Sequence, residues 1–194
     1  MKLLGTLLIA TLAITSFYGC APVVIGGAAS TGAALHSRRT VGTFVDDQAI
    51  ELKARLAVME NKELSSQIHI SITSYNGVVL MSGQAPTEAL SQQAQGIVAA
   101  TEKVRLIHNE MSLAAPNSLM TRSSDTLITA KVKTSLFSIK GIEDFDPTRV
   151  KVVTEDGVVY LMGMVYRNEA DAVGEQARKV SGAEKIVKLF EYLD

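Results

Sequence analysis

Few residues in this sequence have both the type and the spacing that catalysis or metal binding requires. The three histidines, His36, His69 and His108, lie far apart, and no two of them have the spacing of a metal-binding pair such as HExxH. His36 lies among small residues, whereas the other two lie in or near predicted strands. We therefore interpret all three as surface histidines.

The remaining candidates for chemistry are a pair of carboxylates and a few glycines. Asp46 and Asp47 could form a metal pair, but we interpret them as a solvated acid beside a helix cap. Gly26, Gly27 and Gly32 follow no strand, so they do not form a dinucleotide-binding loop. No serine lies in a G-x-S-x-G motif. The sequence therefore predicts a protein that is not an enzyme and holds no metal.

The only cysteine, Cys20, excludes a disulfide framework and a cysteine-rich zinc site. It follows a basic start, Lys2, and an almost wholly apolar run over residues 3–17. This run is shorter than the roughly 20 residues of a spanning helix and fits a secretory signal. The residues directly after the run, Tyr18-Gly19-Cys20, resemble a lipoprotein processing site. We predict a signal peptide over residues 1–19 and a covalent acyl and diacylglyceryl lipid on Cys20; an uncleaved anchor with an inert cysteine is the alternative.

The residues that follow Cys20 indicate where the lipid is inserted. Asp directly after the cysteine resembles an inner-membrane retention signal, and this sequence has Ala21 there. The resemblance implies the inner leaflet of the outer membrane, with the protein facing the periplasm. Residues 20–45 are predicted to be a lipidated tether, because small residues dominate residues 21–37; a short helix lying on the membrane is the alternative.

The composition is that of a folding protein without a strong affinity for nucleic acid. Of its 194 residues, 47% are hydrophobic and 20% are charged, enough for a buried core. The net charge is −1, and there is no tryptophan, so neither a strongly basic domain nor a platform for base stacking is present.

An internal repeat organises the rest of the chain. Residues 47–53 align with 125–131, residues 76–83 with 156–163, and residues 101–107 with 180–186, so the offset stays between 78 and 80 residues. The repeat predicts a first module over residues 46–112 and a second over residues 124–194, joined by a linker with proline, serine and threonine over residues 113–123.

Each module has the pattern of an αββαβ unit. Asp47 and Asp125 are predicted N-caps of first helices with apolar residues four apart. Asn76-Gly77 and Asp156-Gly157 predict two-residue hairpins, in which both central residues need positive φ. Second helices follow near residues 88–100 and 168–180, and last strands near 104–111 and 183–192. The expected fold is α+β, with two helices covering a three-stranded sheet in each module.

The order of elements, the two Asn/Asp-Gly hairpins, Gly83 and Gly163, and Gly182 before a last strand together resemble the BON domain family. Lys103 occupies the position of Gly182 in the first module, which departs from that pattern. Two BON domains behind a lipoprotein signal are similar to outer-membrane lipoproteins of this family. The resemblance implies a role in outer-membrane integrity, with a role at division sites as a further expectation.

The helix after Asp125 carries an outward apolar strip edged with lysines, as an interfacial helix requires. A contact between the modules would explain the strip equally well, and the first module has its own outward strip, Leu52, Leu56 and Met59 beside Lys53 and Arg55. The residues alone do not decide between the two helices. The resemblance favours the second module, whose first helix is implied to bind anionic phospholipid. Its predicted binding residues are Leu127, Ala130, Lys131, Lys133, Thr134 and Phe137.

Two functions from different classes remain open on the sequence. The first is an outer-membrane lipoprotein that binds anionic phospholipid such as phosphatidylglycerol, with outer-membrane or division proteins as further partners. The second is a protein-binding adaptor or chaperone-like module that is held near the membrane only by its lipid.

Overall fold

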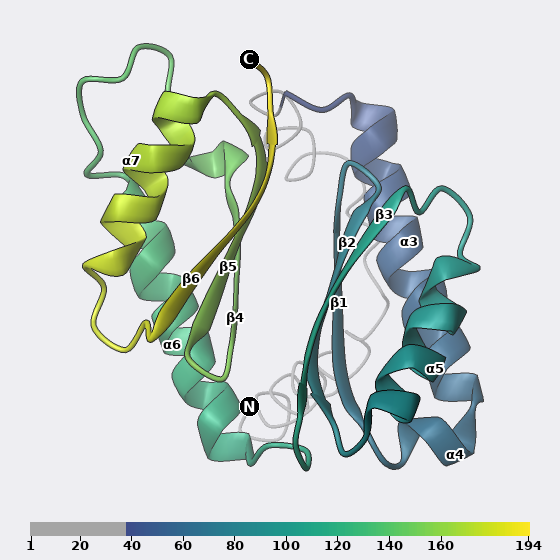
Figure 1. Cartoon of the computed structure of the whole chain (residues 1–194). Coiled ribbons are helices and arrows are strands. Elements are labelled where there is room, and N and C mark those ends of the chain that lie inside the picture. Colours follow the sequence, from purple (N-terminus) through teal and green to yellow (C-terminus); the bar gives the residue numbers. More distant parts are fainter. Residues whose placement is uncertain (1–37) are drawn as a thin grey trace, which may run out of the picture. The chain divides into compact units, whose positions relative to one another are not determined.

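The computed structural model describes residues 38–194 and, at Leu119, the backbone alone (Figure 1). The predicted signal peptide, Cys20 and His36 lie outside the described residues. The first module contains α3 (Val41–Glu60), α4 (Lys62–Ser65), β1 (His69–Tyr75), β2 (Val78–Ala85), α5 (Glu88–Ala99) and β3 (Leu106–Leu113). The second contains α6 (Leu119–Leu136), the 3-10 helix η2 (Pro147–Arg149), β4 (Lys151–Glu155), β5 (Val158–Val165), α7 (Arg167–Arg178) and β6 (Lys185–Tyr192).

Each module forms a three-stranded sheet with the same topology. The sheet orders are β1-β2-β3 and β4-β5-β6. The first two strands of each sheet pair antiparallel through a hairpin, whereas the second and third pair parallel. A parallel pair requires a crossover, which α5 provides in one module and α7 in the other. The predicted α+β fold of two αββαβ modules is confirmed.

The helices cover one face of each sheet, and their inward residues build two separate cores. Ile50, Ala54 and Val58 of α3 are buried against the first sheet, as their spacing predicts. The corresponding buried residues of α6 are Ile128, Val132 and Leu136. The agreement shows that the four-residue spacing identified the inward faces correctly.

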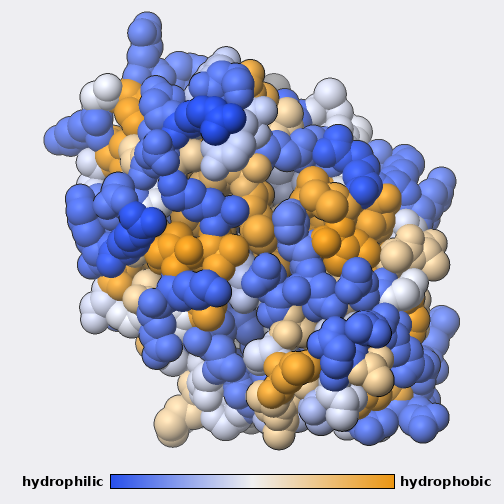
Figure 2. Space-filling view, viewed as in Figure 1, coloured by the Kyte–Doolittle hydropathy of each residue, from blue (hydrophilic) through white to orange (hydrophobic). Residues whose placement is uncertain are grey.

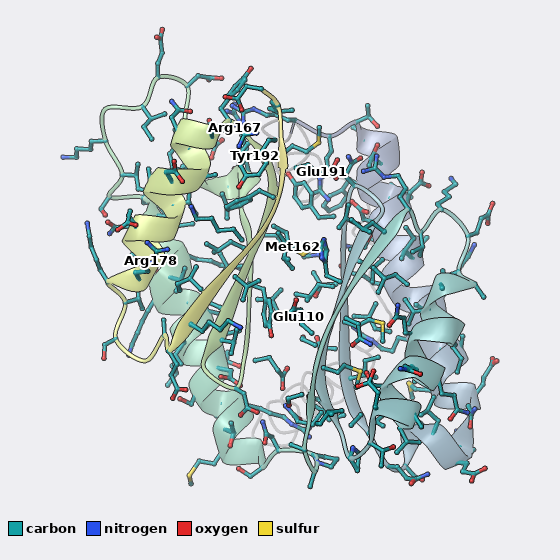
Figure 3. All side chains as sticks on the ribbon, in the orientation of Figure 1. Glu110, Met162, Arg167, Arg178, Glu191 and Tyr192 are labelled. Carbon is teal, nitrogen blue, oxygen red and sulfur yellow. The ribbon has the colours of Figure 1, made fainter. Side chains whose placement is uncertain are left out.

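The other faces of the two sheets pack against each other in a third cluster, which contains Tyr75, Val78, Leu80, Tyr160 and Met162 (Figure 3 shows Met162 between the sheets). Every residue of β2 is therefore buried, because helices cover one of its faces and the second sheet covers the other. In Figure 1 the helices lie on the outer sides of the two facing sheets.

Polar contacts between the modules surround this apolar centre. Lys151 Nζ lies 2.6 Å from Glu51 Oε1, and Arg105 Nη2 lies 2.9 Å from Glu191 Oε2. Gln84, which is fully buried, donates from Nε2 to Glu155 Oε1 at 2.9 Å. The contacts join charged and amide groups of the two modules, and both modules belong to one compact unit.

The hairpin turns have the conformation that their sequences predict. Asn76 and Gly77 have φ values of 54° and 72°, and Asp156 and Gly157 have φ values of 54° and 73°. Positive φ at both central positions suits the twist of the flanking strands. Lys103 also has a positive φ, of 69°, so the first module keeps the left-handed conformation there without the glycine of the second.

The prediction that Asp47 and Asp125 are N-caps is wrong. The N-caps are Thr40 and Ser118, whose side chains accept hydrogen bonds from Thr43 N and Thr121 N. Both helices therefore begin seven residues earlier than predicted, at Val41 and Leu119, inside the segments assigned to the tether and the linker. The local pattern misleads because an aspartate before an apolar run suits a cap equally well.

Both aspartates instead bind the hairpin turn of their own module. Asp47 is 1% exposed and accepts from Asn76 N at 2.8 Å and Gly77 N at 2.9 Å. Asp125 accepts from Asp156 N at 3.0 Å and Gly157 N at 2.9 Å. Each carboxylate thereby satisfies two backbone donors that the turn would leave unpaired, and it fixes the first helix to the sheet.

Candidate membrane-binding face and the adjoining pocket

The outward side of α6 is an exposed apolar strip with cations beside it. Leu127 is 63% exposed and Phe137 is 65% exposed, and Ala130 and Thr134 are also exposed. The alternative that this strip packs between the modules is wrong, because the modules meet through their sheets. Phe137 is the C-cap of α6, so the strip extends just beyond its last turn. Whether the strip binds phospholipid stays a prediction.

Two features that the sequence did not identify make this strip more apolar. Thr134 donates its hydroxyl hydrogen to Ala130 O at 2.9 Å, so its polar group is used within the helix. Met120, 83% exposed, lies seven residues before Leu127 and therefore on the same side of the helix. It was missed because the predicted helix began after Asp125. From Met120 to Phe137 the strip measures about 25 Å at 1.5 Å per residue.

The outward strip of α3 differs from that of α6 in its charges. Leu52 is 58% exposed, so the two strips are similarly apolar at that position. Lys53 of α3, however, lies 3.4 Å from Glu102, whereas Arg55, the other cation beside the α3 strip, is exposed and has no ion-pair partner among residues 38–194. Lys131 and Lys133 of α6 are exposed and have no ion-pair partner among residues 38–194. The α6 strip thus has two cations that residues 38–194 do not neutralise, whereas the α3 strip has one.

A pocket of about 410 Å3 adjoins the C-terminal end of this strip. The first module contributes Arg39, Phe44, Gln48 and Tyr75, and the second contributes Lys133, Phe137, Pro147, Thr148, Val150 and Lys151. Lys133 and Phe137 therefore lie both on the predicted membrane face and in the wall of a pocket between the modules. The other predicted site residues, Leu127, Ala130, Lys131 and Thr134, do not line it.

Two consecutive arginines, Arg38 and Arg39, lie at the start of the described chain, and each binds a carboxylate of a different module. Arg39 donates to Asp47 Oδ2 at 2.6 Å and lies 3.8 Å from the centre of the Tyr75 ring. Arg38 donates to both carboxylate oxygens of Glu169 in the second module, at 2.6 and 2.9 Å. The chain that leads back toward Cys20 consequently departs from a point that both modules hold.

The Arg38–Glu169 pair is partly removed from water, and the pKa of Glu169 reflects this. Burial acts most strongly and raises the pKa of this carboxyl group. The hydrogen bonds from Arg38 and from Tyr166 N, together with the charges of Arg38 and Arg149, outweigh it, so the pKa lies below its usual value. Glu169 is therefore the ionised partner that a bidentate guanidinium contact requires.

The histidines and the two adjacent aspartates that the sequence offered for chemistry do not form a common site in residues 38–194. His69 is not a simple surface residue, because it is half-buried with Nε2 3.7 Å from Glu155 Oε1 of the second module. His108 is half-buried on β3. Asp46 pairs with Lys103 at 2.8 Å, apart from Asp47. Across residues 38–194 no group of three or more His, Cys, Asp or Glu side chains could hold a metal ion.

None of the helices described is both long and apolar enough to cross a bilayer. On the side shown in Figure 2, hydrophobic side chains form separate patches among hydrophilic ones.

Comparison with known proteins agrees with this architecture. The BON domain family matches residues 46–115 and again residues 124–194. The chain belongs to the BON domain family. It is 34% identical over its full length to Outer membrane lipoprotein DolP of Haemophilus influenzae, covering 97% of that protein.

Two further relatives share the greater part of this BON-domain chain. The 21 kDa hemolysin of Actinobacillus pleuropneumoniae is 35% identical, over 80% of this chain and 78% of its own length. Osmotically-inducible protein Y of Escherichia coli is 30% identical, over 77% and 74%. The chain is a tandem BON-domain protein of the outer membrane.

Proposed function

We propose that this BON-domain protein is anchored by a lipid on Cys20, faces the periplasm, and binds anionic phospholipid through the outward face of α6, thereby supporting outer-membrane integrity. The observation that carries the proposal is the coincidence of an exposed apolar strip with two lysines that have no ion-pair partner among the described residues. Either feature alone is common on protein surfaces, whereas an interfacial helix requires both.

The contact between α6 and the membrane surface can be weak, because the lipid anchor already holds the protein at the membrane. Each lysine near an anionic surface contributes on the order of 1 kcal/mol, and salt screens this contribution. The 18 residues from Cys20 to Arg38 span at most about 60 Å, which keeps the α6 face close to the membrane that holds the lipid. Binding by the folded part therefore needs only modest affinity.

The experiment uses residues 33–194, which contain both cores, without the lipid. Wild type is expected to sediment with vesicles that contain phosphatidylglycerol and not with phosphatidylcholine vesicles. Leu127→Glu removes an apolar side chain from the interface and adds a repelled charge, together worth about 2–3 kcal/mol, so binding should weaken roughly 30- to 150-fold.

Leu52→Glu is the matched control, because it introduces the same charge at a similarly exposed leucine on α3. It should bind like wild type, and circular dichroism should show both variants folded. If Leu52→Glu abolishes vesicle binding and Leu127→Glu does not, the membrane face belongs to the first module and the proposal is wrong.

The α3 strip supports a second candidate function, that of an adaptor for another protein. Leu52, Leu56 and Met59 are about half exposed, and the neighbouring Lys53 is already paired with Glu102. An apolar strip with one of its two cations already paired suits a protein partner better than an anionic surface. In this function Leu52→Glu would impair outer-membrane integrity in cells without affecting vesicle binding.

A further inference from the structure

All the charged side chains that line the pocket between the modules are cationic. Arg39, Lys133 and Lys151 line it, and no acidic residue does. Two carboxylates stand behind this wall: Asp47 binds Arg39, and Glu51 binds Lys151, both at 2.6 Å. They hold the guanidinium and the ammonium in position without lining the pocket themselves.

The lysines have donors left for a ligand. An ammonium group has three N–H donors. Lys151 uses one for Glu51 and a second for Ser74 O at 3.2 Å, which leaves a third. Lys133 has no ion pair or hydrogen bond among the described residues. The three cations and two carboxylates sum to +1, the charge that complements one monoanion.

A second pocket, of about 450 Å3, lies along the same two modules and serves as a comparison. Its lining includes Arg55 and Arg122 but also Asp125 and Glu155. Because both signs are present in its wall, it offers no net attraction to an anion. A lining whose charged residues are all cationic is therefore a feature of the pocket beside Lys133, and not of the junction between the modules in general.

The remaining wall of the first pocket is apolar and leads to the membrane face. Phe44 and Val150 contribute to it, and Phe137, 65% exposed, stands where the pocket meets the strip of α6. A ligand that fits must therefore place a negatively charged group in the pocket and have an apolar part that extends out of the pocket toward Phe137. A volume of about 410 Å3 suits a small polar group and is too small for a complete diacyl lipid.

We propose that this inter-module pocket binds the phosphodiester headgroup of one anionic glycerophospholipid, with Lys133 and Lys151 as donors to the phosphate and the acyl chains leaving past Phe137. This inference rests on the proposed function and deepens it, because it assigns a stoichiometric headgroup site to a face that would otherwise bind lipid only as a charged surface. It also gives the first module a part in lipid binding, through Arg39 and Phe44.

The test is a titration of residues 33–194 with dihexanoylphosphatidylglycerol below its micelle concentration, followed by calorimetry and by NMR shifts of the lining residues. We expect saturable binding of one lipid per chain. Lys133→Gln should weaken binding about tenfold to a hundredfold, the loss of one charge-assisted hydrogen bond. This variant is suitable because Lys133 is exposed and pairs with no described residue, so the fold does not depend on it.

Lys140→Gln is the matched control, since it removes the same charge from an exposed side chain that lies beyond the end of α6 and does not line the pocket. It should leave monomer binding within twofold of wild type. Gln48→Lys, which adds a cation to the wall, should tighten binding. Equal losses from Lys140→Gln and Lys133→Gln would overturn the pocket in favour of a diffuse surface charge.

Two ligand controls separate the lipid headgroup from other sources of phosphate. Glycerol 3-phosphate and inorganic phosphate should bind at least tenfold more weakly, since they lack the apolar part that contacts Phe137; equal affinity would refute a lipid site. If the short lipid does not bind although vesicles do so in a Leu127-dependent way, the pocket proposal fails and the proposed function stands. If the short lipid binds and Leu127→Glu leaves vesicle binding intact, the proposed function fails and the pocket stands.

Discussion

Replacement of Asp125 by alanine tests whether this carboxylate anchors the hairpin turn or merely caps a helix. Its oxygens accept from Asp156 N and Gly157 N at 3.0 and 2.9 Å, and the residue is only 6% exposed. Asp125→Ala therefore removes two hydrogen bonds to a charged group and leaves two backbone donors without their partner.

The expected loss follows from these two bonds. A hydrogen bond to a charged group contributes about 1.5–3 kcal/mol, so the loss of two should lower the free energy of unfolding of Asp125→Ala by about 3–6 kcal/mol. The matched control is Ser118→Ala, which removes the actual N-cap of the same helix. Loss of a cap costs about 1 kcal/mol, so the two variants should differ by at least about 2 kcal/mol.

Urea unfolding of residues 33–194, followed by circular dichroism, measures the difference. Hydrogen exchange locates it, because the amides of Asp156 and Gly157 should lose protection in Asp125→Ala and keep it in Ser118→Ala. Equal free-energy losses in the two variants, with the turn amides still protected, would show that Asp125 does not anchor the turn.

Three further changes have defined outcomes. Burial, followed by the nearby charges of Glu110, Glu155 and Asp156, raises the pKa of Tyr160 to about 12. The stability that this shift contributes is present below the unfolded pKa of about 10 and should be lost as the pH rises toward 12. An absorbance titration should show one tyrosine that ionises at a higher pH than the others, and this step should be absent in Tyr160→Phe. Gly157→Val should lower the free energy of unfolding by about 1–3 kcal/mol through strain at positive φ. Gly77→Val should lower it further, because a Cβ at Gly77 would lie 2.9 Å from the Lys103 backbone oxygen, whereas a Cβ at Gly157 would meet the movable Glu184 side chain. Calorimetric melting curves compare the two variants. Cys20→Ser should abolish acylation and release the protein from membranes, whereas an unmodified mature N-terminus in wild type, seen by mass spectrometry, would contradict lipid attachment.

Local patterns in the sequence determined the two modules and their internal order. The repeat offset, the four-residue spacing of Ile128 and Val132, and the Asn-Gly and Asp-Gly turns each depend on neighbouring residues, so they could be read without a structure. The same holds for the outward position of Leu127 and Phe137, since the inward face of a helix fixes the outward one.

Only the tertiary structure decided which groups meet across long separations. The sequence placed Asp47 and Asp125 at helix starts, because it shows that a carboxylate precedes an apolar run and not that a turn 30 residues later needs an acceptor. The pocket depends on the same kind of information: Gln48 and Lys151 line it together although about a hundred residues separate them. They meet because the two sheets pack face to face, and that packing results from apolar side chains whose partners lie in the other module.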